Sequence, residues 1–322
     1  MTPLQFEAQY QSEWDELQSL LAQLRGGSKK SAGVAGERFA SLYRRACEQL
    51  ALARARSYPA HITERLNELT ADAHQLIYQR KEFGLSRLSR MIAVDFPRAV
   101  RAHAAYVWLS TAVFAIPMVV LGLLVYFKPE IILSMVDPLT AAEFEHMYSD
   151  AEAIGRRRDA ESNWSMFGFY IRHNIGIGFQ CFAGGLFAGI GSLFFLAFNG
   201  AFIGAIAGFL TERGLSSTFY SFVVTHGAFE LTAIVLSGAA GLRIGHALIA
   251  PGRRTRSNAL VVAARESIVI IYGVTGLLVI AAAVEAFWSS ARWIPLPLKY
   301  SVAAVCWFVV LGYLWRQGRD AS

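Results

Sequence analysis

The chain has 322 residues, of which 54% are hydrophobic and only 17% are charged, with a mean hydropathy of +0.37 and a net charge of +6. Soluble domains carry about a quarter charged residues, so this composition excludes an ordinary soluble globular protein. The excess of arginine does not indicate a nucleic-acid partner, because it lies beside long apolar runs, where it sets membrane topology.

Residues 1–105 make up about a third of the chain but hold 26 of its 54 charged residues, and we assign them to a helical cytoplasmic region. A stripe of large apolar residues at steps of three and four predicts a helix over 3–25: Phe6, Tyr10, Trp14, Leu17 and Leu21. A linker over 26–31 and a second helix over 36–56 follow. A third helix begins near Pro59 and has one apolar face, formed by Ile62, Leu66, Leu69, Ala73, Leu76 and Ile77. Three such helices can bury a small core.

Residues 80–101 alternate basic and apolar side chains just before the first apolar run. This pattern favours an amphipathic helix on the membrane surface, whose arginines reach anionic lipid. The alternative is an ordinary bundle helix with its arginines in water. The basic residues that we assign to the membrane surface, here and in a later loop, are Arg87, Arg90, Arg98, Arg101, Arg253, Arg254 and Arg256.

The rest of the chain, 106–322, predicts a transmembrane bundle, because a spanning helix needs about 20 apolar residues. The expected fold class is therefore an all-α polytopic membrane bundle of about six helices. The expected spans are about 106–127, 166–188, 190–211, 219–245, 267–288 and 298–315. The glycine-rich run 166–211 is split into two helices that meet near Gly189, with one long helix and a re-entrant half-helix as the alternative.

Charge asymmetry sets the expected orientation. The segment before the first span, the loop 253–265 and the tail after 315 are rich in arginine, and six spans place all three on one side. The positive-inside rule assigns that side to the cytoplasm, with both termini there. The loop 128–165 is acidic and would lie outside.

Ionisable groups inside membrane spans are costly and usually face a bundle interior or a water-filled cavity. We expect an intramembrane polar cluster in the outer half of the membrane, with Arg172 compensating Glu230 or Glu285. Its expected members are Arg172, His173, Asn174, Asn199, His226, Glu230 and Glu285.

Small residues mark the faces on which helices can approach closely. Those expected to pack helices are Gly200, Gly204, Gly208, Ser237, Gly238, Gly241 and Gly245. His226 and Glu230 share the small-residue face of the fourth span. The glycines of the third span make it the expected close neighbour of the fourth.

The polar cluster allows three interpretations: a structural network that fixes packing, a substrate or proton path, and a metal or catalytic site. His226 and Glu230, four residues apart, could supply two zinc ligands, with His173 or Glu285 as a third. No metalloprotease, nucleophile-elbow or phosphate-loop motif is present. We therefore expect no catalytic residues, no metal and no cofactor.

Several segments are specific in order and spacing. They are 171–175 (IRHNI), 196–200 (LAFNG) with Gly204, 225–231 (THGAFEL), 237–245 (SGAAGLRIG), 251–252 with Arg256, and 283–287 (AVEAF). With these segments the chain resembles the stage II sporulation protein M family of bacterial membrane proteins. The likeness continues at 42–45 (LYRR) and 73–78 (AHQLIY). The family often has asparagine where His173 stands and proline where Thr232 stands.

The resemblance implies a bacterial inner-membrane protein; the named member of the family anchors peptidoglycan-degrading partners during engulfment. We therefore expect a non-enzymatic scaffold or cell-envelope assembly factor, with the lipid bilayer and membrane or envelope proteins as partners and a homo-oligomer as a possibility. A transporter or channel for a small polar solute is the alternative, and an intramembrane metalloenzyme is the third hypothesis.

Overall fold

The computed structural model describes residues 1–25, 34–78, 85–149, 160–291 and 293–319, and these are helical, with no strand among them. The predicted all-α fold class is confirmed. The chain divides into two compact units, Met1–Arg87 and Leu88–Ser322. Residues 88–105, which we assigned to the N-terminal region, thus belong to the same compact unit as the membrane helices.

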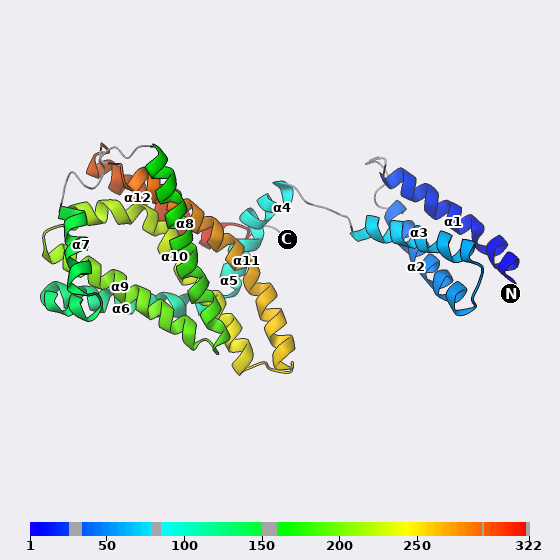
Figure 1. Ribbon diagram of the computed structural model, residues 1–322, viewed down its shortest axis with the longest axis horizontal. Helices are drawn as coiled ribbons and strands as arrows, with labels where there is room; N and C mark the ends of the chain where they lie inside the picture. The colour runs from blue at the N-terminus through cyan, green and yellow to red at the C-terminus, as the bar shows by residue number, and fades with distance from the viewer. Residues whose placement is uncertain (26–33, 79–84, 150–159, 292, 320–322) are drawn as a thin grey trace. The chain divides into compact units, whose positions relative to one another are not determined.

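The first unit is a three-helix domain of α1 (Pro3–Arg25), α2 (Val34–Ala55) and α3 (Ala60–Tyr78) (Figure 1). Its core holds the predicted stripes of α1 and α3, although Tyr10 is only partly buried. The indole Nε1 of Trp14 donates a hydrogen bond to Gln49 Oε1 at 2.7 Å, which satisfies the one polar atom of that buried ring. The predicted linker 26–31 and the side chains of Leu76 and Ile77 lie outside the described residues.

The second unit begins with a broken helical segment: α4 (Leu85–Arg90), the π-helix η2 (Met91–Asp95) and α5 (Phe96–Ala102). The α5 segment packs against the bundle, because Phe96 is buried and lies where a Cβ at Gly273 would stand. Arg98 and Arg101 donate to the carbonyl oxygens of Gly318 and Leu314, at 2.7 and 2.8 Å. α5 thus packs against the bundle, and two of the predicted membrane-surface arginines bond to the C-terminal segment; residues 79–84 lie outside the described chain.

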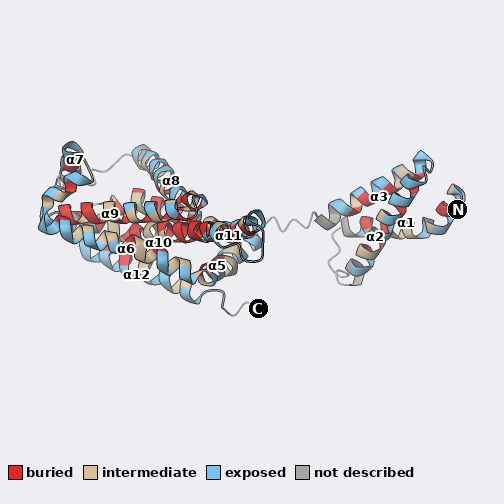
Figure 2. Ribbon diagram, turned by 90° about the horizontal axis from the view of Figure 1, so that it is seen from below, coloured by how far each residue is buried: buried red, intermediate tan, exposed pale blue. Residues whose placement is uncertain are grey.

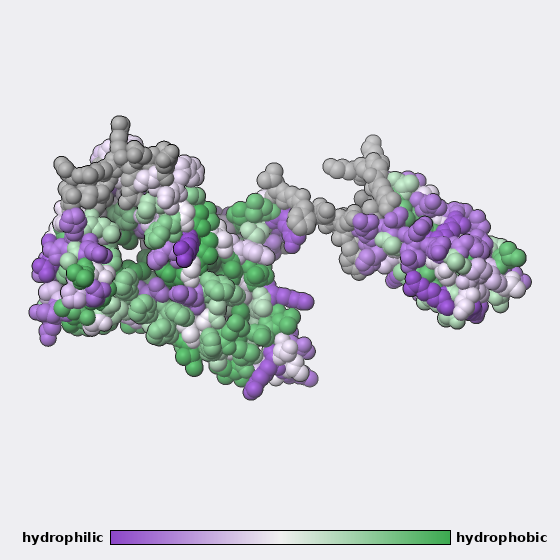
Figure 3. All heavy atoms as spheres, viewed as in Figure 1, coloured by the Kyte–Doolittle hydropathy of each residue, from purple (hydrophilic) through white to green (hydrophobic). Residues whose placement is uncertain are grey.

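The membrane bundle contains α6 (Ala104–Phe127), α8 (Ala160–Ala183), α9 (Ile190–Glu212), α10 (Ser216–Ile249), α11 (Arg256–Ala283) and α12 (Leu296–Arg316). A π-helix, η5 (Val284–Ser289), continues α11. All of these except α8 are long and apolar enough to cross a membrane, which makes five such helices among the described residues. Apolar residues cover much of the visible face of this unit, whereas the visible face of the three-helix domain is mainly hydrophilic (Figure 3).

α8 covers most of the predicted span 166–188 and runs the height of the bundle, although it carries Arg172 and His173. Tyr170 packs against Ala282 and Ala286, in the layer where Ser289 bonds to His226. Beyond the other end of α8, a Cβ on Gly185 would lie 2.1 Å from the Gly241 carbonyl oxygen. Along α10, the 15 residues from His226 to Gly241 rise about 22 Å. α8 therefore extends from the level of His226 to the level of Gly241, as α10 does.

The run 166–211 breaks as predicted. α8 ends at Ala183, the 3₁₀ turn η4 (Gly184–Leu186) follows, and Gly189, at the N-cap of α9, has a φ of +84°. A left-handed φ favours glycine because it has no Cβ. Two helices meet near Gly189 as predicted, and with 24 and 23 residues neither α8 nor α9 is the half-helix of the alternative.

The glycines of α9 pack against α6, whereas we predicted that they would pack against the fourth span, α10. A Cβ on Gly200, Gly204 or Gly208 would lie 2.0–2.2 Å from the carbonyl oxygens of Phe114, Met118 and Gly122, all on α6. The third and first spans, not the third and fourth, therefore form this close pair. The small-residue face of α10 meets the region around the α8–α9 turn instead: Gly241 faces Cys181 and Ser192, and Gly245 faces Gly189. The buried residues gather along these inner faces (Figure 2).

The described part of the predicted acidic loop 128–165 is largely helical. It contains the 3₁₀ helix η3 (Pro129–Ser134) and α7 (Pro138–Ser149). Tyr148 of α7 packs edge-on against Phe219 at a ring distance of 5.3 Å, and its carbonyl accepts a hydrogen bond from Thr218 Oγ1 at 3.0 Å. α7 is thus fixed to the start of α10. Residues 150–159 lie outside the described residues.

Asp137, just before α7, caps the first turn of the helix. Its carboxylate accepts hydrogen bonds from the Thr140 hydroxyl at 2.7 Å and from the backbone N–H of Thr140 and Leu139 at 3.0 Å. These bonds hold the pKa of Asp137 below its ordinary value of 3.8. The bond from the Thr140 hydroxyl has the largest effect. A lowered folded-state pKa means that the stabilisation is present above the unfolded-state pKa and is lost as pH falls through the folded value.

We therefore expect the first turn of α7 to be protected at neutral pH and to lose protection below about pH 4. Hydrogen exchange in the peptide 138–145, corrected for intrinsic exchange rates, measures this. In Asp137→Asn, whose amide does not titrate, the acid-dependent loss should disappear. An unchanged acid-dependent loss in that variant would show that another group controls the helix start.

Candidate functional site

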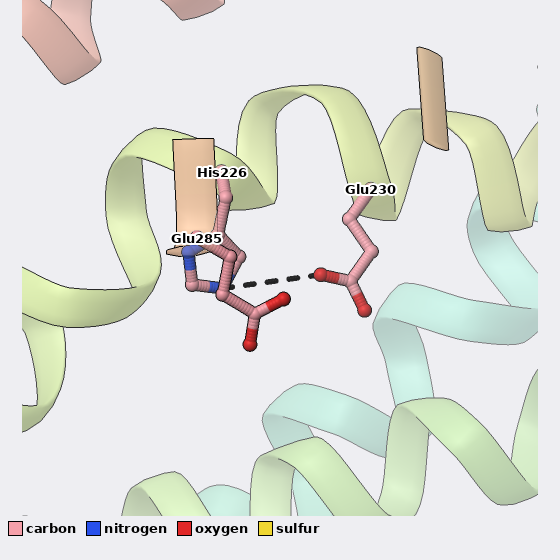
Figure 4. Close-up of side chains that lie close together, drawn as sticks. All are labelled: His226, Glu230 and Glu285. Carbon is pink, nitrogen blue, oxygen red and sulfur yellow. Dashed lines mark ion pairs between the residues drawn. The ribbon is translucent and has the colours of Figure 1, made fainter. Parts of the chain in front are cut away.

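Two helices position the central side chains of the site. His226 and Glu230 lie one turn apart on α10 and share a face. Glu285 and Ser289 lie on η5, the π-helix that ends the predicted fifth span. A π-helix carries one extra residue per hydrogen-bonded ring and often occurs at functional sites. The side chains of His226, Glu230 and Glu285 converge between these two elements (Figure 4).

The three groups are close enough to act together. His226 Nε2 lies 3.9 Å from Glu230 Oε2, and one ligand atom from each of the three residues lies within 4.8 Å of the others. His226 Nδ1 forms a 3.0 Å hydrogen bond with Ser289 Oγ. That bond fixes the ring and turns Nε2 toward the carboxylates. His226 is only 5% exposed, so these groups interact away from bulk solvent.

Asn174 and Tyr148 complete the wall around Glu285. Asn174 of α8 is 1% exposed and lies beside Glu285, and its Nδ2 makes no hydrogen bond of normal geometry. Tyr148 of α7 is buried beside Glu285 and Tyr170. Its pKa is raised above the ordinary value, mainly by burial and to a smaller extent by these two neighbours. The Tyr148 phenol therefore stays protonated and can act as a hydrogen-bond donor, not as a charge.

Lys299 of α12 belongs to the same layer, and sequence reasoning missed it. Its side chain is 4% exposed, and Nζ donates to the Ser289 carbonyl oxygen at 2.9 Å. A signal was present, because Lys299 falls inside the span 298–315 that we predicted. The prediction of the polar cluster did not include it.

The structure brings four of the seven predicted members together: Asn174, His226, Glu230 and Glu285. Arg172 and His173 are exposed on α8, and His173 stacks on Phe169 at a ring distance of 5.8 Å. Asn199 donates to the Phe195 carbonyl of its own helix at 2.8 Å. The expected ion pair of Arg172 with Glu230 or Glu285 is not formed among the described residues.

The two carboxylates of the cluster, Glu230 and Glu285, limit what it can do chemically. Two carboxylates this close, in surroundings of low polarity, cannot both be ionised without a compensating charge. A shared proton, a cation or a positively charged neighbour would supply it. The group can therefore fix helices through hydrogen bonds, hold a proton, or bind a cation, and all three uses require the same convergence.

A separate apolar pocket lies between α6, α9, α10 and α12. Its volume is about 540 Å³, and it is lined mainly by aliphatic and aromatic residues, among them Leu123, Ile203, Val223 and Trp307. A lining of this kind suits an acyl chain better than a polar solute. The His226 cluster does not line this pocket.

Comparison with known protein families divides the chain into an N-terminal and a membrane part, as the two compact units do. The family model described as "Stage II sporulation protein M" matches residues 110–290. A second model, described as "Domain of unknown function (DUF8413)", matches residues 4–79. No curated protein and no solved structure matches the chain. The first match covers α6 to η5 and therefore includes His226, Glu230 and Glu285.

Proposed function

Because the chain belongs to the stage II sporulation protein M family, we propose that this multi-pass membrane protein is a non-enzymatic scaffold of the bacterial inner membrane. In this proposal it gathers proteins that build or remodel the cell envelope. The membrane bundle is the anchor, and the three-helix domain is the module that recruits partners.

The observation that carries the proposal is the independent core of the N-terminal domain. Phe6, Trp14, Leu17 and Leu66 are each 0–1% exposed within α1–α3, and this domain forms a compact unit of its own. A domain that completes its own core leaves its polar surface available for other proteins. We take this separate module as support for an anchored scaffold.

The alternative of a solute path receives less support. The pocket within the bundle is lined mainly by apolar side chains, whereas a path for a small polar solute needs hydrogen-bonding groups along its wall. The buried polar cluster does not line that pocket, and His226 is almost fully enclosed.

The proposal includes an orientation with both termini in the cytoplasm. Three exposed arginines lie where α10 turns into α11: Arg253 and Arg254 in the turn and Arg256 at the first position of α11. Arg98 contacts the C-terminal segment at Gly318. This basic end should face the cytoplasm, and α7 should lie outside.

Impermeant thiol labelling of intact cells or spheroplasts tests the orientation. We expect Glu143→Cys, exposed on α7, to react from outside. Arg254→Cys should react only after permeabilisation, and the native chain, with Cys47, Cys181 and Cys306, gives the background. Labelling of Arg254→Cys in unpermeabilised cells would contradict the orientation.

Cross-linking in native membranes tests the scaffold itself. The full chain is compared with a chain that lacks residues 1–79, at equal abundance. We expect defined cross-links to envelope proteins that depend on residues 1–79. Cross-links that persist without this domain would remove its proposed role, and the absence of any protein cross-link to the full chain would contradict a scaffold.

A further inference from the structure

We propose that His226, Glu230 and Glu285 form a binding site for one divalent transition-metal ion, such as Zn²⁺, that joins α10 to the π-helix at the end of α11. The proposed scaffold needs no such ion, so this inference goes beyond it and can fail independently. The role that we assign to the ion is structural: it would hold two neighbouring elements of the bundle together at the end away from the Arg253–Arg256 turn.

The ligand atoms are near the spacing that a metal requires. Two ligands at about 2.1 Å from a tetrahedral zinc ion lie about 3.4 Å apart. The His226 Nε2 to Glu230 Oε2 distance is 3.9 Å, and the ligand atoms of all three residues lie within 4.8 Å of one another. We expect rotations of the two glutamate side chains to close this gap.

The histidine is already oriented as a metal ligand. Ligating histidines usually hydrogen-bond through their second ring nitrogen, which fixes the tautomer and the ring plane. Here His226 Nδ1 bonds to Ser289 Oγ at 3.0 Å, and Nε2 faces Glu230. The π-helix matters for this arrangement, because Glu285 and Ser289 both lie on η5 and both reach His226.

The buried Asn174 side chain points to the same place, because it lies against Glu285. Asn174 Nδ2 is enclosed and makes no hydrogen bond of normal geometry, although the side chain lies beside Glu285. Buried amide nitrogens without a partner are rare. When Glu285 turns one oxygen toward an ion, the Asn174 amide can donate to the other oxygen. The unsatisfied amide is then explained as outer support for a ligand.

Charge also favours a divalent ion. Two carboxylates cancel the charge of a divalent cation, and the imidazole ligand adds none, which lowers the cost of placing the ion within a membrane bundle. Mixed nitrogen and carboxylate ligands suit zinc and other first-row transition metals better than Mg²⁺ or Ca²⁺. Calcium takes six to eight oxygen ligands, whereas this cluster offers two carboxylates and a histidine.

Metal content and melting of the detergent-purified full chain test the site. The protein is stripped with a chelator, loaded with ZnCl₂ and desalted. We expect about one zinc per wild-type chain and fewer than about 0.1 in Glu230→Gln and Glu285→Gln. Zinc should raise the melting temperature of the wild type but not of these variants. Glu212→Gln and His146→Gln, which change exposed residues outside the cluster, should behave like the wild type.

Two further variants keep the test decisive if a glutamine variant does not fold. Glu285→Asp retains the charge but shortens the side chain, and Ser289→Ala removes the bond to His226 Nδ1. Each should weaken zinc binding by about tenfold or more while the fold is kept. A folded wild type that binds no zinc after loading overturns the proposal. So does zinc that is retained in the folded glutamate variants, because it would then be bound elsewhere.

Discussion

Gly204→Leu is expected to remove folded protein from the membrane, because it separates α6 from α9. A Cβ at this position would lie 2.0 Å from the Met118 carbonyl oxygen, and the contact is with backbone, which cannot rotate away. Gly200 and Gly208 meet α6 in the same manner one turn away on each side. Helix association in lipid depends on this close packing, since lipid tails are as apolar as the side chains.

The expected loss for Gly204→Leu exceeds the roughly 1–3 kcal/mol that is typical of an overpacked core. Abundance in membranes and melting in detergent measure it. The matched control is Gly276→Leu on α11, where a Cβ would find nothing within 4 Å. We expect this control to fold normally. Equal loss in both variants would mean that any leucine at a span glycine is harmful, and normal folding of Gly204→Leu would contradict the α6–α9 packing.

Trp14→Ala is expected to unfold the N-terminal domain while the bundle stays folded. Trp14 is 1% exposed and donates to Gln49, and Arg65 covers its ring at 5.4 Å. Truncating a buried tryptophan costs about 3–5 kcal/mol, which is a large part of the stability of so small a domain.

Limited proteolysis of the full chain detects this selective unfolding. Rapid cleavage within residues 1–78 should appear in Trp14→Ala, with the fragment from 88 onward left intact. Leu4→Ala is the control, because Leu4 lies on the same helix and is 80% exposed. If Trp14→Ala also destabilised the bundle, the two units would not be thermodynamically separate.

The sequence predicted the helices well wherever an apolar pattern was long. The α1 stripe from Phe6 to Leu21 and the break at Gly189 both lie where the pattern placed them. The packing of residues 88–102 was harder to predict, because basic side chains there have partners that are distant in the sequence. Arg98 bonds to Gly318, and local periodicity cannot show such a contact.

The candidate site was predicted in part. His226 and Glu230 are local neighbours on one helix, and span depth placed Glu285 in the same layer. Depth does not fix rotation about a helix axis, however. Arg172 lies only two residues before Asn174, yet Asn174 is buried beside Glu285 and Arg172 is exposed. The glycines of α9 show the same limit: their spacing predicted a tight face but not that α6 would occupy it.

Complementation of a strain that lacks the gene tests the scaffold most directly. Two variants are compared at wild-type abundance in the membrane: a chain without residues 1–79, and full-length Glu285→Gln. We predict that the truncated chain fails to restore envelope integrity and that Glu285→Gln restores it. The reverse result, with function lost in Glu285→Gln and kept without the three-helix domain, would contradict the scaffold and place the function in the buried cluster.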